Sequence, residues 1–194
     1  MTALASFRVD RPVPWLLQPI YGETTRYTSL LFIHGGTGLI TGLLWWIFRH
    51  DPELQSPESV QVAMWVLWDL AGGSLAHLTR TNHQYWARLP TEMRLLALAS
   101  MAWQPIVLVL MFDQPMLMLV ELHLFAGIAF WLVSRVPLYP VLAGAMVMAL
   151  GLTYQLSLPP VMALLTVFYC LKAVIAYRPE RKLPTEIPIR QAVQ

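Results

Sequence analysis

Long apolar runs alternate with short polar segments along this chain. The runs cover residues 29–48, 59–78, 93–112, 116–133, 136–155 and 159–176. A helix rises roughly 1.5 Å per residue, so each run is long enough to cross a hydrocarbon core of about 30 Å, the fourth and sixth only just. Prolines lie at the edges of most runs, where helices start or stop. The pattern predicts six transmembrane helices, although the last two runs also suit short helices buried among the others.

The composition favours a lipid environment for these runs. Of the 194 residues, 57% are hydrophobic and only 12% are charged, against roughly 25% charged residues in soluble proteins. Lipid is the solvent in which such long uncharged stretches are stable. We therefore predict an all-α integral membrane protein, a multi-pass protein of the plasma membrane or, in a bacterium, of the inner membrane. Its partner is the lipid bilayer, and its scattered basic residues form no patch for nucleic acid.

The basic residues predict the orientation of the six helices. If the N-terminus is cytoplasmic, all but one of the 13 Lys and Arg residues lie at or near the cytoplasmic face, and only Arg49 lies outside. Cytoplasmic loops of membrane proteins carry an excess of these residues. A wrong helix count is hard to reconcile with this distribution, so the count and the orientation support each other. Both termini are expected in the cytoplasm.

Three parts of the chain follow from this topology. Residues 1–28 contain three prolines, so they are expected to form neither a span nor a regular amphipathic helix, but a cytoplasmic segment that lies against the headgroups. Residues 29–177 form the transmembrane domain. Residues 178–194 are polar and basic, which predicts a flexible tail that is attracted to anionic lipid.

An aspartate interrupts the second run, in the stretch VLWDLAGGSLAHL. Asp69 lies about nine residues, or roughly 13 Å, from the cytoplasmic end of that helix, close to the middle of the bilayer. Gly73 and His77 follow at spacings that put them on the same helical face, which predicts a polar track toward the cytoplasm. Gly72, Gly73 and Ser74 also make the helix thin there, so that another helix can approach closely.

A carboxylate at this depth has a functional and a structural interpretation. An ionisable residue at mid-bilayer costs a few kcal/mol even on the gentlest insertion scale, which makes Asp69 a candidate functional residue. Alternatively, Asp69 is protonated or hydrogen-bonded as an ordinary buried polar group. The candidate partners for that structural role are Gln104, Ser100 and Thr41.

Polar residues also lie within other runs. Glu121 is within about two turns of the outer end of the fourth helix, and His123 points to nearly the opposite face. A helix with polar groups on both sides is expected in the centre of the bundle or at a contact with another chain. His34 lies near the cytoplasmic end of the first helix. Lys172 lies about one turn from the inner end of the sixth helix, where its ammonium group is expected to reach the membrane surface.

Two functional hypotheses of equal rank follow from these residues. The first is transport, as a pathway for protons, ions or a small solute. Its residues would be Asp69, Glu121, His77, His34 and Gly73. The second is an accessory or scaffold subunit, as part of a larger membrane complex or a homo-oligomer, with no chemistry of its own.

Two further alternatives involve a cofactor or a reaction. An electron-transfer subunit would bind haem b through two histidines from different helices, and His34, His77 and His123 are the candidates. An enzyme acting on lipid would hold a phosphate headgroup with the arginines of the loop 80–94, but no nucleophile is evident there. Neither nucleotide-binding nor metal-binding motifs occur, and Cys170 is the single cysteine, so no metal site is predicted.

Overall fold

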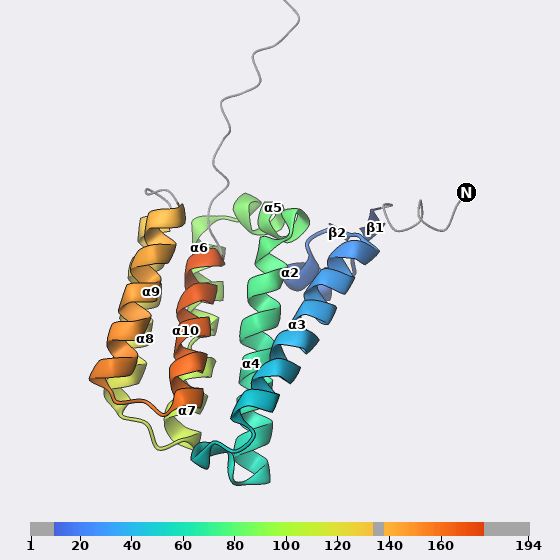
Figure 1. Cartoon of the computed structure of the whole chain (residues 1–194). Helices are drawn as coiled ribbons and strands as arrows, with labels where there is room; N and C mark the ends of the chain where they lie inside the picture. The colour runs from blue at the N-terminus through green and yellow to red at the C-terminus, as the bar shows by residue number, and fades with distance from the viewer. Residues whose placement is uncertain (1–9, 134–137, 177–194) are drawn as a thin grey trace, which may run out of the picture.

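The computed structural model describes residues 10–133 and 138–176, most of which are helical (Figure 1). The longer helices are α3 (Tyr27–Phe48), α4 (Pro57–Leu78), α6 (Thr91–Ser100), α7 (Trp103–Met111), α8 (Met116–Val133), α9 (Leu138–Gln155) and α10 (Pro160–Ile175). The shorter elements are β1 (Arg11–Pro12), η1 (Trp15–Leu17), α2 (Gln18–Tyr21), β2 (Thr24–Thr25), η2 (Pro52–Leu54) and α5 (Arg80–Arg88). Successive long helices run in alternating directions, and α7 continues the direction of α6 (Figure 1).

Each apolar run of the sequence coincides with a helix, and residues 93–112 coincide with α6 and α7 together. The prediction of a helical protein is confirmed, apart from the two-residue strands β1 and β2. In the described part of the chain, two stretches are long and apolar enough to cross a membrane, Tyr27–Phe48 and Thr91–Met111. They support a membrane location, whereas six spans and cytoplasmic termini stay predictions.

Local sequence explains where α4 begins. Pro57 occupies the first helical position, where a missing N–H leaves no hydrogen bond unmade. The Ser56 hydroxyl accepts a hydrogen bond from the Ser59 N–H at 3.0 Å, and Glu58 adds a negative charge to the first turn. These signals define the start of α4, and hence the position of Asp69 along its length.

A proline interrupts the third apolar run. Pro105 has no N–H to donate to the carbonyl of Met101, and its ring would clash with that carbonyl in a continuous helix. The chain turns at residues 101–102, and the Gln104 N–H donates to Met101 at 3.2 Å instead. Gln104 therefore lies in the first turn after the break, and its side chain is fully buried.

Helix α3 buries two threonines and exposes several leucines. Its buried residues are Ile33, Thr37 and Thr41. Thr37 is 1% exposed, whereas Leu39 on the same helix is 73% exposed. In water this arrangement would leave a large apolar surface uncovered. It suits a helix whose outer face meets lipid.

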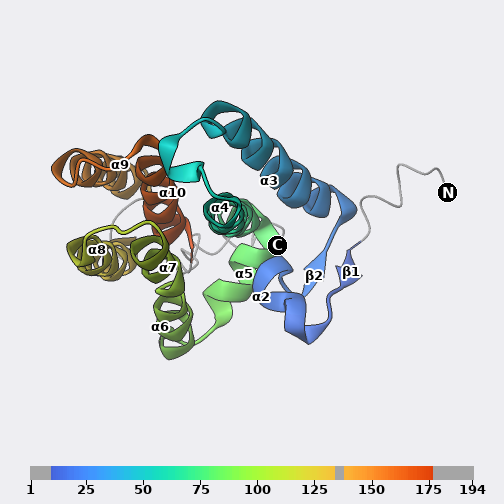
Figure 2. The same cartoon turned by 90° about the horizontal axis from the view of Figure 1, so that it is seen from below.

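Helix α4 lies in the interior of the bundle, and α8 does not (Figure 2). Helix α4 packs against α3, α7 and α10, and its residues Val66 and Leu70 are fully buried. Helix α8 packs against α7, α9 and α10 but leaves Leu124 and Trp131 exposed. The expectation that the fourth apolar run is central is wrong for the single chain, because α10 takes the place beside α4. Its alternative, a contact with another chain, stays a prediction.

The polar segment after α4 forms the helix α5 where the sequence predicted a loop. Asn82 of α5 donates from Nδ2 to the main-chain oxygens of Pro19 and Ile20, at 2.9 and 2.7 Å. Trp86 donates from Nε1 to the same Pro19 oxygen at 3.0 Å. The N-terminal segment thus packs on the bundle through α2 and α5, in addition to any contact with headgroups.

Candidate functional site

Asp69 of α4 forms an ion pair with Lys172 of α10. The Nζ atom of Lys172 lies 2.6 Å from Oδ2 of Asp69. Only 7% of the Lys172 side chain is exposed, compared with 39% of the Asp69 side chain. The prediction that the Lys172 ammonium reaches the membrane surface is therefore wrong, because an opposite charge lies within its reach inside the bundle.

A third helix contributes to the same carboxylate. Gln104 of α7 donates from Nε2 to Oδ2 of Asp69. The Nζ atom of Lys172 also lies 3.4 Å from the main-chain oxygen of Asp69. Of the partners expected from the sequence, Gln104 is present, and Ser100 and Thr41 make no such bond in the described structure. Both side-chain donors converge on Oδ2, so Oδ1 has no hydrogen-bond partner among residues 10–133 and 138–176.

Gly73 makes room for this ion pair. A Cβ atom built at Gly73 would lie 2.6 Å from Cε of Lys172 and 3.0 Å from its Nζ. The next glycine toward Asp69 is also close-packed, since a Cβ at Gly72 would lie 3.2 Å from Oγ1 of Thr37. The prediction that these glycines allow close approach is confirmed, and the groups that approach are a lysine side chain and a threonine of α3.

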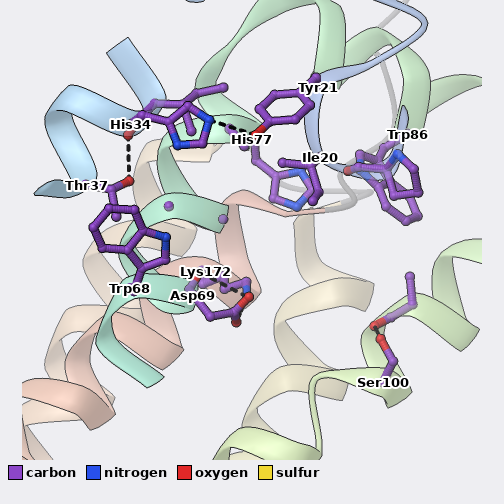
Figure 3. Close-up of a pocket in the computed structure, with 16 residues that line it drawn as sticks. Ile20, Tyr21, His34, Thr37, Trp68, Asp69, His77, Trp86, Ser100 and Lys172 are labelled. Carbon is purple, nitrogen blue, oxygen red and sulfur yellow. Dashed lines mark hydrogen bonds and ion pairs between the residues drawn. The ribbon is translucent and has the colours of Figure 1, made fainter. Parts of the chain in front are cut away.

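A cavity of about 360 Å³ lies beside the ion pair (Figure 3). Asp69, Gly73 and His77 border it from α4, and His34 borders it from α3. All the residues proposed from the sequence for a transport pathway therefore meet at one space, except Glu121. The shared helical face of the three α4 residues is the feature that local periodicity predicted.

Segments distant in the sequence complete the wall. Tyr21 comes from α2, Trp86 from α5 and Ser100 from α6, and Ser100 lies across the cavity from Asp69 (Figure 3). The Tyr21 hydroxyl lies 2.7 Å from Nε2 of His34. Burial raises the pKa of Tyr21, so its hydroxyl stays protonated at neutral pH and links α2 to α3.

Aromatic rings add apolar surface to the polar lining. Trp68 precedes Asp69 in the sequence, borders the cavity and is 45% exposed. The ring of His77 lies with its centroid 5.9 Å from that of Trp86. The cavity thus combines a carboxylate, the lysine paired with it, further polar side chains and indole rings, which is a lining that suits a small polar or charged molecule.

Glu121 lies apart from this cavity. Its Oε1 accepts from Nε2 of Gln155, on α9, at 3.4 Å. Its Oε2 is buried and has no hydrogen-bond partner in the described part of the chain. His123 bonds from Nδ1 to the Leu119 oxygen of its own helix at 2.8 Å. A role for Glu121 stays a prediction, and it would act at a different place from Asp69.

The candidate haem ligands are only partly brought together. His34 and His77 border the same cavity, whereas His123 is not among the residues that line it. Nε2 of His34 is already bonded to Tyr21, so ligation through that atom would have to displace the tyrosine. The haem b alternative stays a prediction that a Soret band in the purified protein would support. In the described residues, no three His, Cys, Asp or Glu side chains gather as a metal site.

Sequence reasoning missed Lys172 as a site residue, although helix geometry contains a signal for it. Side chains on a helix lean toward its N-terminus. In the predicted topology, the N-terminus of the sixth helix lies outside, so a lysine near its cytoplasmic end leans into the membrane. That direction leads toward the depth of Asp69. An opposite charge on a neighbouring helix then favours the buried position over the surface.

Comparison of the chain with protein-family models, with curated proteins and with solved structures finds no match. Function is therefore inferred from the cavity and the charges that border it.

Proposed function

We propose that this is a multi-pass membrane protein with six membrane-spanning helices and both termini in the cytoplasm. Three observations support the proposal. The long helices alternate in direction, α3 keeps threonines inside and leucines outside, and nearly all Lys and Arg residues fall on one predicted face. In this frame, α5 and the N-terminal segment lie at the cytoplasmic end of the bundle.

The cavity then serves transport of protons, or of a small solute that moves with them. One observation carries this proposal: a buried lysine is paired with a carboxylate that keeps one oxygen free beside a cavity. Desolvating two charges often costs more than their attraction returns, and apolar replacements of buried ion pairs are often neutral or stabilising. Stability alone therefore gives little reason for Asp69 and Lys172, whereas a transport pathway needs ionisable groups within the membrane.

The positions of the other polar residues suit such a pathway. His77 lies two turns from Asp69 on the same face, toward α5, and His34 meets Tyr21 beside it. A proton or a polar solute at Asp69 is thus connected to the cytoplasmic end by polar side chains rather than by leucines. The Tyr21–His34 bond lies at that end of the route.

Proton flux into proteoliposomes tests this proposal. A pH-sensitive dye is enclosed in the vesicles, and potassium with valinomycin holds the membrane potential at zero. The wild-type protein should dissipate an imposed pH gradient faster than protein-free vesicles do. The double variant Asp69→Asn/Lys172→Met should return to the protein-free rate. It removes both charges together, so neither remains buried without a partner.

Glu121→Gln is the matched control. It removes a carboxylate that lies outside the cavity, and it should keep the wild-type flux. Wild-type vesicles that are as tight as protein-free ones would contradict a pathway that conducts protons without a co-transported solute. An equal loss of flux in both variants would contradict a pathway through Asp69.

An accessory or scaffold subunit is the second candidate, and one observation favours it. The buried Oε2 of Glu121 has no partner in the described part of the chain, and an unsatisfied buried acceptor costs about 1–3 kcal/mol. Because Oε2 is covered within the single chain, a second chain that packs on α8 would remove that cost by turning the Glu121 side chain toward a donor of its own. Native mass spectrometry of the protein extracted in mild detergent tests this idea, since a purely monomeric species would count against it.

A further inference from the structure

Two hydroxyls and one indole N–H at the cavity already donate to main-chain oxygens, which leaves the two hydroxyls free to accept. The Ser100 hydroxyl donates to the Ala97 oxygen at 2.6 Å, and the Thr37 hydroxyl donates to the Ile33 oxygen at 2.6 Å. Each hydroxyl has one proton, so its remaining lone pairs only accept. The indole N–H of Trp86 is also committed, to a main-chain oxygen of α2. A ligand that brings its own N–H donors complements such a lining.

Oδ1 of Asp69 is the strongest free acceptor at the cavity. Lys172 and Gln104 both bond to Oδ2, and no donor to Oδ1 occurs among the described residues. A carboxylate oxygen forms its strongest hydrogen bonds with charged N–H donors. The lysine also borders the cavity, but its side chain is almost fully buried, so the more exposed member of the pair is negative.

An indole ring borders the same cavity as this acceptor. Trp68 borders the cavity and precedes Asp69 in the sequence. A cation within about 6 Å of an indole centroid is attracted by the negative face of the ring. The same ring offers apolar surface to the carbon skeleton of a ligand.

Resting on the transport function proposed above, we propose that the cavity binds a small organic ammonium ion. The ammonium group donates to Oδ1 of Asp69, and its carbon skeleton packs against Trp68, while Lys172 keeps Oδ2. The volume of about 360 Å³ admits a molecule the size of an aromatic amine.

Two cations then compete for one carboxylate. Lys172 neutralises much of the Asp69 charge, so it weakens the attraction for a second cation. Removal of the lysine charge should therefore tighten ammonium binding, whereas removal of the carboxylate should abolish it. If the ion pair had a purely structural role, removal of either charge would instead weaken ammonium binding.

Titration calorimetry of the full chain in lipid nanodiscs tests the inference with three probes of one size. They are 2-phenylethylammonium, the neutral 2-phenylethanol and the anion 3-phenylpropionate. The ammonium ion should bind about tenfold or more tightly than either other probe, as expected for a charge-assisted hydrogen bond. Empty nanodiscs provide the correction for partition into lipid.

Variants assign the binding to the named residues. Asp69→Asn/Lys172→Met should lose the preference for the ammonium ion, Lys172→Met should bind it more tightly, and Glu121→Gln should match the wild type. Trp68→Leu leaves the ion pair intact and should weaken binding by about two- to fivefold, which provides a second test if Lys172→Met does not fold. Equal or tighter binding of the alcohol or the anion, or full binding by the double variant, would overturn the inference.

The outcome separates this inference from the proposed function. Proton flux that depends on Asp69, without a preference for ammonium, would overturn the ligand class and leave the pathway in place. Selective ammonium binding without any proton flux would support the ligand class and contradict the proton pathway.

Discussion

At the scale of single residues, Gly73 and Lys172 depend on each other. The lysine side chain runs over the glycine to reach Asp69, and no side chain larger than hydrogen fits between them without a shift. Gly38 of α3 is a useful contrast, because a Cβ built there meets no described atom within 4 Å apart from the adjacent residues and backbone of its own helix. Close packing therefore requires a glycine at position 73, whereas the packing around Gly38 does not require one.

Gly73→Ala should destabilise the protein by about 1–3 kcal/mol, since the added methyl group pushes the lysine off Oδ2 of Asp69. Gly38→Ala should be neutral or stabilising by up to about 1 kcal/mol, because alanine is the better helix former and space is open. Unfolding in mixed micelles followed by circular dichroism measures both. Similar losses in the two variants would show that Lys172 does not limit the space at Gly73.

The ion pair itself predicts strong coupling between two distant positions. Asp69→Asn and Lys172→Met should each destabilise the protein, by about 3 kcal/mol for a pair with one well-buried member. The double variant should lose less than the sum, with a coupling energy of roughly 1–3 kcal/mol. The same micelle unfolding assay measures the four proteins of this cycle. Additive losses would mean that the two charges do not interact in the folded state.

At the scale of elements, α5 attaches the N-terminal segment to the bundle. Asn82 is fully buried and holds two consecutive main-chain oxygens of α2. Because Tyr21 of α2 also borders the cavity, this attachment positions one wall of the candidate site. Helix α5 is thus part of the site architecture, although it is too short and polar to resemble a membrane span.

Asn82→Ala should free α2 from α5, because at least the Ile20 oxygen loses its donor, at a cost of about 1–3 kcal/mol. Hydrogen exchange of residues 20–25 should become faster, and limited proteolysis should cut there earlier. Gln84→Ala on the same helix is the control, and it should leave exchange in this segment unchanged. Unchanged exchange in Asn82→Ala would place the attachment elsewhere.

At the scale of the whole molecule, the bundle holds one charged cluster within a mostly apolar interior and exposes many large apolar side chains. Exposed leucines and tryptophans occur along α3, α6, α7, α8 and α9, while Asp69, Lys172 and Gln104 meet in the interior. Soluble monomers rarely expose apolar side chains in such large contiguous areas. In lipid, exposed apolar side chains cost no free energy, whereas an unpaired charge costs more than it does in water. The ion pair between Asp69 and Lys172 agrees with such surroundings.

Cysteine labelling in intact cells tests the resulting topology. A cysteine at Gln55, between α3 and α4, should react with a membrane-impermeant reagent from outside, and one at Gln84 in α5 should not. The native Cys170 is buried and should give no background. A reversed pattern would contradict the orientation, and outside labelling at both positions would mean a wrong helix count.

The sequence alone determined the positions of the helices that coincide with the apolar runs, and the shared face of Asp69, Gly73 and His77. Both follow from local rules, since a helix forms its hydrogen bonds within four residues and repeats its faces at fixed spacing. The glycines beside Asp69 also indicated a close neighbour, because their lack of a side chain is a local property. Pro105 is visible in the sequence as well, but the apolar pattern around it predicts one continuous helix.

Only the tertiary structure decided which residues Asp69 meets, and which helices lie inside. Lys172 is far from Asp69 along the chain, and its approach depends on the rotation of α10 against α4. An apolar helix that faces lipid lacks the polar side by which a soluble helix reveals its orientation. Packing among distant segments therefore decides which helices are neighbours and how each is rotated. The same packing places α8 at the edge, docks α2 on α5 and encloses the cavity.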